Sequence, residues 1–253
     1  YNINTFSFLK KKIDTLNLHD IDTIIHLSAL VHQMGGASKE EYKKVNVTQT
    51  LDLAKKAKIS GVKHFIFMST VKVYGEETNV AYNENAVCLP QDEYGISKLQ
   101  AEQELQLLVD DNFIVSIIRT PIIYGYGVKA NIKSLIFLVS KIGILPCGNI
   151  KNKRSMVYIG NICHLIDVIC NKQINGIFLA SDEEPLSTTE LIDKISKSLN
   201  KKILLIQIPF FKELLKIIKP SFYKRLYGSL EVDNSITREV LKLENLYSTE
   251  EGI

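Results

Sequence analysis

The chain has 253 residues, of which 45% are hydrophobic and 23% charged, and its formal net charge is +3. This balance excludes a disordered chain, which is poor in apolar residues and strongly charged. It also argues against a nucleic-acid-binding protein, because so small an excess of cations leaves no basic footprint.

The length fits one large domain or one and a half, which is enough to bury a sizeable core. No apolar run reaches the roughly 18–20 residues that span a bilayer, and the first residues lack the pattern of a signal peptide. The four cysteines are too scattered for a disulfide scaffold. We therefore expect a cytoplasmic protein with free, buried thiols.

The first half of the chain alternates short apolar runs with longer amphipathic ones. Runs at 21–29, 62–70 and 113–119 predict strands, and apolar positions at helical spacing predict helices over 40–58 and 92–110. Strands that read as continuous apolar runs are buried on both faces. The sequence therefore predicts an α/β fold, a Rossmann-like doubly wound parallel sheet with helices on both faces.

Beyond about residue 125 this rhythm loosens. The patterns predict helices at 131–142, 161–170 and 188–199 and strands at 176–180 and 203–208. Ser187 and Glu190 have the spacing of a capping box at a helix start. We predict two domains, a sheet domain over 1–125 and a smaller α/β lobe over 126–253 that is partly interleaved with it.

One segment of the second half is amphipathic and basic. It comprises residues 210–218 together with Tyr223, Lys224 and Arg225. Such a pattern fits contact with a membrane surface or packing of the apolar side on the core of the lobe. We favour packing on the core.

The strongest local signal is the segment Tyr94-Gly95-Ile96-Ser97-Lys98. Positions four apart share a helix face, so the phenol of Tyr94 and the ammonium of Lys98 point the same way. A tyrosine with an ordinary pKa of about 10 is a poor base, but a neighbouring cation lowers that pKa. The pair fits proton transfer to and from an alcohol, although by itself this spacing is more often an ordinary solvated helix face.

Other polar residues accompany this pair at the ends of predicted strands. Ser69 and Thr70 end the strand upstream, Asn46 lies in the preceding helix, and Thr120 and Pro121 follow the next strand. In a parallel sheet, ligands bind beyond the carboxyl ends of the strands. These positions are therefore candidates for one common site.

The set resembles the NAD-dependent epimerase/dehydratase family of the extended short-chain dehydrogenase/reductases. Its closer likeness is to the UDP-sugar C4 epimerases and C4 ketoreductases of bacterial surface-polysaccharide pathways, and it is carried by the segments 125–135, 145–162 and 228–235. The resemblance implies that 1–125 is an NAD-binding domain and that 126–253 binds the substrate.

The resemblance also implies a role for each matched residue. Tyr94 is implied as the catalytic acid/base, Lys98 as the group that lowers the Tyr94 pKa and holds the nicotinamide ribose, and Thr70 as a partner of the reacting hydroxyl. The residues implied to bind the cofactor are Leu27, Ser28, Ala29, Asn46, Ser69, Tyr94, Lys98, Thr120 and Pro121. The residues implied to bind the substrate are Thr70, Asn131 and Arg154. The Arg154 guanidinium suits a diphosphate because it offers parallel hydrogen-bond donors. No cluster of His, Cys, Asp and Glu in the sequence has the spacing of metal ligands.

The implied activity is C4 epimerisation of a UDP-hexose or UDP-N-acetylhexosamine, by proton removal at the C4 hydroxyl and reversible hydride transfer to NAD. Two alternatives stay open: a C4 ketoreductase of a 4-keto-6-deoxy sugar nucleotide that uses NADPH or NADH, and a truncated fragment without activity. A 4,6-dehydratase is rejected. Dehydratases of this superfamily resemble one another in an Asp-Glu pair where this chain has Val71 and Lys72.

The family carries a glycine fingerprint, GxxGxxG, on its first strand and helix, whose N-terminus binds pyrophosphate. This chain contains no such fingerprint, so we expect it to be N-terminally truncated, without its first strand–helix units. The sequence then does not distinguish NAD from NADP, because the residue that would contact the adenosine ribose belongs to the missing N-terminal part. The resemblance further implies a homodimer through the helices at 40–58 and 92–110. The sugar and its carrier, UDP or a lipid diphosphate, stay open.

Overall fold

The computed structural model describes residues 2–8, 12–31, 37–128 and 130–253, and the side chains of residues 130 and 131 lie outside this description. The chain forms two compact units. The first comprises Tyr1–Gly75, Ala86–Arg119 and Asp167–Phe178, and the second comprises Glu76–Asn85, Thr120–Ile166 and Leu179–Ile253. Both units are therefore assembled from segments that alternate along the sequence. The domain boundary near residue 125 stays a prediction.

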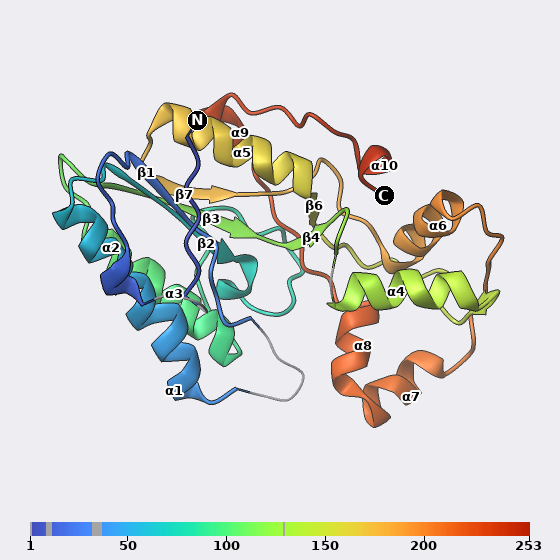
Figure 1. The fold of residues 1–253 in the computed structure, drawn as a ribbon. Coiled ribbons are helices and arrows are strands. Elements are labelled where there is room, and N and C mark those ends of the chain that lie inside the picture. Colours follow the sequence, from blue (N-terminus) through green and yellow to red (C-terminus); the bar gives the residue numbers. More distant parts are fainter. Residues whose placement is uncertain (1, 9–11, 32–36, 129) are drawn as a thin grey trace. The chain divides into compact units, whose positions relative to one another are not determined.

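The first unit contains a four-stranded sheet with the strand order β1-β2-β3-β7. Its strands are β1 (Thr23–His26), β2 (His64–Thr70), β3 (Ile114–Thr120) and β7 (Gly176–Leu179). Its helical elements are η1 (Ile13–Thr15), α1 (Lys39–Tyr42), η2 (Lys43–Thr48), α2 (Gln49–Ile59), η3 (Val71–Val73), α3 (Glu93–Gln106) and the end of α5 (Ile159–Lys172). Figure 1 shows α1, α2 and α3 on one side of this sheet and the end of α5 on the other. The predicted sheet flanked by helices is confirmed.

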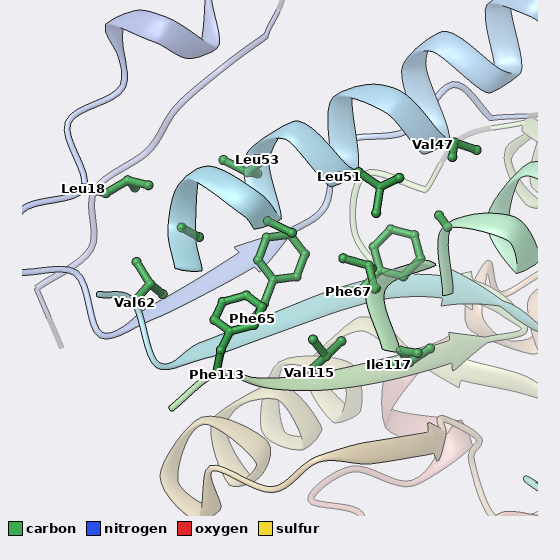
Figure 2. Close-up of a cluster of buried hydrophobic side chains, with 14 residues drawn as sticks. Leu18, Val47, Leu51, Leu53, Val62, Phe65, Phe67, Phe113, Val115 and Ile117 are labelled. Atoms are coloured by element: carbon green, nitrogen blue, oxygen red, sulfur yellow. The ribbon is translucent and has the colours of Figure 1, made fainter. Parts of the chain in front are cut away.

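The core of this unit lies between the sheet and α2. β2 is buried along almost its whole length, as its continuous apolar run predicts. Figure 2 shows Phe65 and Phe67 of β2 beside Phe113 and Val115 of the β3 region, with Leu51 of α2 above them. These rings and aliphatic side chains fix α2 on the sheet, and burial of each large side chain stabilises the fold by roughly 1.5–3 kcal/mol.

The predicted helix over 40–58 is confirmed as a continuous run through α1, η2 and α2. Its middle, η2, is a π-helical segment, a local widening that often occurs at functional sites. The helix ends before Gly61, whose φ of +83° lies in the left-handed region that glycine adopts without strain. The helix therefore has a defined stop, and its π-helical turn carries Asn46.

The second unit contains two parallel strand pairs, β4 with β6 and β5 with β8. Its strands are β4 (Ile122–Tyr124), β5 (Ile144–Leu145), β6 (Met156–Tyr158) and β8 (Leu204–Leu205). Its helices are α4 (Ala130–Lys141), the start of α5, α6 (Thr188–Ser198), α7 (Phe211–Ile218), α8 (Pro220–Tyr227), α9 (Ser235–Leu241) and α10 (Thr249–Gly252). The strand predicted over 203–208 is thus only two residues long, although Ile206 after it still exchanges backbone hydrogen bonds with Leu145 and Gly148.

The capping box at the start of α6 is confirmed. Ser187 accepts a hydrogen bond from the backbone N–H of Glu190, and the Glu190 carboxylate accepts one from the backbone N–H of Ser187. All four cysteines are free, but Cys147 alone among them is buried, so the expectation of buried thiols is wrong for the others. Within the described ranges, no helix is long and apolar enough to cross a membrane.

Candidate active site

The start of α3, which carries Tyr94, is fixed by its neighbours. Asp92 caps the helix, because its Oδ1 accepts a hydrogen bond from the Gly95 N–H at 2.7 Å. The other oxygen of Asp92 pairs with Lys72 Nζ at 2.6 Å, which ties the helix start to η3. A Cβ on Gly95 would lie only 2.9 Å from the Lys72 carbonyl oxygen. The glycine after Tyr94 therefore allows the helix to approach the end of β2.

This approach brings Tyr94 to Thr70, the last residue of β2. The Thr70 hydroxyl forms a side-chain hydrogen bond with the Tyr94 phenol, and Thr70 is itself buried. The buried ring of Tyr42, from α1, lies 6.4 Å from the Tyr94 ring. Two of the three predicted catalytic residues are thus in direct contact.

Burial raises the pKa of Tyr94 to about 12, the charge of Asp92 raises it further, and the hydrogen bond from Thr70 opposes both. The sequence predicts the opposite direction, a phenol pKa lowered by Lys98. The protein alone does not show that lowering, because withdrawal of the phenol from water outweighs any nearby positive charge.

Lys98 lies one turn after Tyr94 and is only 1% exposed. Its Nζ stands 3.7 Å from the centre of the Phe67 ring, and among the residues that the structure describes no acceptor hydrogen-bonds to it. Burial lowers the pKa of Lys98 to about 7, and the negative charge of Glu102 opposes this shift. A lysine that is only partly protonated near neutral pH has a weaker effect on Tyr94, which is consistent with the high phenol pKa.

Asn46 joins the chain after β1 to the catalytic helix. Its Oδ1 accepts from the Leu30 N–H at 2.8 Å, and its Nδ2 donates to the Leu30 carbonyl at 2.9 Å and to Ser97 Oγ at 3.0 Å. Its side chain is therefore fully used within the protein. Asn46 positions the segment after β1, where Leu27 and Ser28 are exposed and Ala29 is half-buried.

A buried carboxylate, missed by the sequence analysis, joins α3 to two strand ends. Glu102 accepts a hydrogen bond from Ser69 Oγ at the end of β2. It also pairs with Arg119 in β3, at 2.6 Å from Nη2 and 3.2 Å from Nε. Arg119 Nη1 donates to the Tyr74 hydroxyl at 2.7 Å. The only signal in the sequence is that Glu102 follows Lys98 by four positions on the same helix face.

The ion pair between Glu102 and Arg119 is almost fully buried. Burial by itself lowers the pKa of the Arg119 guanidinium, but the hydrogen bonds and charge of Glu102 outweigh it and raise that pKa. Ser69 uses its hydroxyl proton on Glu102. The Ser69 side chain thus belongs to the buried network of Glu102 and Arg119, next to Thr70 at the end of β2.

The remaining predicted residues belong to the second unit. Thr120 is buried at the end of β3, Pro121 follows it half-buried, and Asn131 lies in α4 with its side chain outside the described part. The guanidinium of Arg154 lies against the end of α8, donating from Nε to the Gly228 carbonyl at 3.0 Å and from Nη2 to the Lys224 carbonyl at 2.7 Å. Their roles in binding stay predictions.

Burial lowers the pKa of Arg154, while the carboxylates of Glu77 and Glu76 oppose the shift. The side chain is thus partly engaged by carbonyls and carboxylates of its own unit. Across the described residues, no group of three or more His, Cys, Asp and Glu side chains is placed to hold a metal ion.

The sheet flanked by helices, with a tyrosine and a lysine on the helix beside a strand end, defines a Rossmann-like α/β protein. A sequence model of the NAD-dependent epimerase/dehydratase family matches residues 9–179. The chain belongs to this family and is an enzyme of the epimerase/dehydratase kind.

Two curated relatives are similar over most of the chain. A Vibrio cholerae protein named UDP-glucose 4-epimerase is 40% identical over 250 residues, which cover 94% of this chain and 76% of that protein. An Escherichia coli O157:H7 protein named N-acetyl-alpha-D-glucosaminyl-diphospho-ditrans,octacis-undecaprenol 4-epimerase is 30% identical over 198 residues, covering 76% of this chain and 59% of that protein.

Among solved structures, the fold matches UDP-glucuronic acid 4-epimerase from Bacillus cereus in complex with NAD. The TM-score is 0.75 at 21% identity, and the match covers 96% of this chain and 76% of that one. The Rossmann-like fold predicted from the sequence is confirmed.

Proposed function

We propose that the protein is an NAD-dependent nucleotide-sugar epimerase that inverts C4 of a UDP-hexose or UDP-N-acetylhexosamine. The observation that carries the proposal is the hydrogen-bonded pair of Thr70 and Tyr94, with the buried ammonium of Lys98 one turn along α3. The names of the two curated relatives support a 4-epimerase. One of those names denotes a sugar carried on a lipid diphosphate, so a lipid diphosphate is the alternative to UDP as the carrier.

The residues of the first unit fit NAD. The Lys98 side chain is only 1% exposed and its ammonium has no hydrogen-bond acceptor among the described residues, so the hydroxyls of a nicotinamide ribose would supply acceptors. Leu27 and Ser28 are exposed directly after β1, at the strand end where nucleotides bind in such sheets. NAD supplies the hydride acceptor and donor when it is bound.

Tyr94 and Thr70 would handle the proton of the C4 hydroxyl. With a pKa of about 12 the phenol keeps its proton at neutral pH, so the protein alone holds Tyr94 as an acid. An acceptor on the Lys98 ammonium favours its charged form and so raises its pKa above about 7. The restored charge beside Tyr94 then lowers the phenol pKa. Ligand binding would in this way convert Tyr94 into a base.

The other reactions of the family are less well supported by these residues. Directly after Thr70 come Val71, which is buried, and Lys72, which pairs with Asp92. Neither of these two positions carries a carboxylate that could assist the elimination of water. A C4 ketoreductase would use the same three residues and remains the second candidate.

The test is a turnover assay with UDP-glucose, UDP-N-acetylglucosamine and their C4 epimers in the presence of NAD, followed by proton NMR. Tyr94→Phe should lower kcat by roughly 10²–10⁴ and leave NAD binding intact, because the phenyl ring keeps the packing. Tyr126→Phe is the matched control, since Tyr126 is fully exposed. Full activity of Tyr94→Phe contradicts the mechanism. Turnover of a 4-keto sugar with NADPH or NADH, without epimerisation, would show a reductase.

A further inference from the structure

The helices α7 and α8 present an apolar surface that the chain leaves uncovered. No residue of either helix is buried. The side chains of Phe210 and Ile217 are 83% and 81% exposed. We call the exposed set the α7 face; its residues are Phe210, Leu214, Ile217, Ile218 and Phe222. The predicted packing on the core is wrong for this face, because only Phe211 and Leu215 of α7 turn inward and are half-buried.

The residues of this face form one continuous stripe. Leu214, Ile217 and Ile218 follow one another at spacings of three and one, which places them on one side of α7, and Phe210 directly precedes this helix. Phe210 has a φ of +61°, a conformation that is unfavourable for a bulky residue. Its ring nevertheless points to solvent instead of into a core. The exposed apolar side chains of this face fit an occupant from outside the chain.

Positive charge is concentrated around the same face. Residues 210–227 contain the five cations Lys212, Lys216, Lys219, Lys224 and Arg225 against the single anion Glu213. This segment therefore carries a net charge of +4, which exceeds the +3 of the whole chain. All five cations are exposed. A partner that binds the α7 face must therefore combine an apolar surface with negative charge.

We propose that the α7 face docks on the surface of an anionic lipid bilayer. An amphipathic helix with aromatic and aliphatic side chains on one side and lysines on the other lies at the boundary between headgroups and acyl chains. The stems of Lys212 and Lys216 are long enough to reach the headgroups from the flank of the helix. Each cation near such a surface strengthens binding on the order of fivefold.

The charge argues against a second copy of the chain as the occupant. In a two-fold interface the same patch faces itself, so five cations would meet five cations. A bilayer that contains phosphatidylglycerol instead supplies the opposite charge. The inference does not rest on the proposed function, because it concerns binding and not turnover.

The experiment is flotation of the purified full chain with vesicles of phosphatidylcholine, with and without phosphatidylglycerol. The chain should bind the anionic vesicles, fail to bind the neutral ones and be released by high salt. Ile217→Asp should weaken binding at least about tenfold. Ile59→Asp is the matched control, because Ile59 on α2 is 88% exposed and far from this segment in sequence. It should bind as the unaltered chain does.

A second variant keeps the inference falsifiable if Ile217→Asp fails to fold, which circular dichroism reports. Lys216→Glu reverses one exposed charge and should weaken binding to anionic vesicles at low salt but not at high salt. Equal binding by the unaltered chain and both variants overturns the proposal. A change of oligomeric state in Ile217→Asp, measured by light scattering, also overturns it, because a second copy would then cover the face.

Discussion

Replacement of Glu102 by leucine should destabilise the protein by about 3–5 kcal/mol. The magnitude follows from the surroundings of the carboxylate. Glu102 and Arg119 are almost fully buried, so solvent does not screen the guanidinium that the substitution leaves unpaired. The Ser69 hydroxyl also loses its acceptor. For a chain of this size each kcal/mol shifts Tm by roughly 2–4 °C, so we expect a loss of about 6–20 °C.

The assay is urea and thermal unfolding of four proteins: the unaltered chain, Glu102→Leu, Arg119→Met and the double variant. A buried pair that is replaced on both sides by apolar residues is often neutral. The double variant should therefore be more stable than the sum of the two single losses predicts. Asp110→Asn is the control, because it breaks a partly exposed pair with Lys58, and such pairs contribute little to stability. A loss below about 1 kcal/mol in Glu102→Leu, or strict additivity in the double variant, would refute the reasoning.

Three further predictions concern the buried polar groups of the first unit. Between pH 7 and 10.5 Lys98 is protonated in the unfolded chain but largely neutral in the folded one, where its pKa is about 7, so the unfolding free energy rises with pH in this window. Lys98→Met should flatten this rise. An unchanged pH dependence of the unfolding free energy, measured in urea, contradicts this. His26 has a pKa lowered to about 3 by burial and then by Lys98, so the unfolding free energy should fall by about 1.4 kcal/mol per pH unit below 6.5. His26→Gln should remove this part of the acid sensitivity, and an equal acid profile of both proteins would speak against it. Asn46→Ala should speed amide hydrogen exchange at Leu30, which loses its acceptor, whereas Asn171→Ala on the exposed end of α5 should not; equal exchange rates in the two variants would show that Asn46 does not hold this segment.

The fold was predictable where one element carries its own signal. β2 and β3 read as continuous apolar runs and are buried along their length. The capping box at Ser187 is local in the same sense. In the second unit the sequence predicted a strand over 203–208, of which β8 keeps two residues, but β5 carried no such signal, because these two-residue strands exist only through each other.

The site was predictable only where a single helix or strand end marks its residues. Tyr94, Lys98 and Thr70 are marked by spacing on one helix and by the end of one strand. Glu102 was missed, because a lysine and a glutamate four apart are typical of a solvated helix face. Its burial depends on Ser69 and Arg119, which two different strands bring to one carboxylate. Such a convergence is a property of the packed unit.

The pKa values of Tyr94 and Lys98 show why a local argument also reversed one expectation. Spacing correctly indicates that a phenol and an ammonium share a face, and charge alone would then lower the phenol pKa. Burial acts on both groups in the opposite sense and favours their neutral forms, with Tyr94 at about 12 and Lys98 at about 7. The protein alone therefore holds a protonated acid beside a partly neutral lysine. Under the proposed function, a ligand that accepts hydrogen bonds from Lys98 would restore its charge and lower the phenol pKa, so Tyr94 would become able to give up its proton, and act as a base, only once the site is filled.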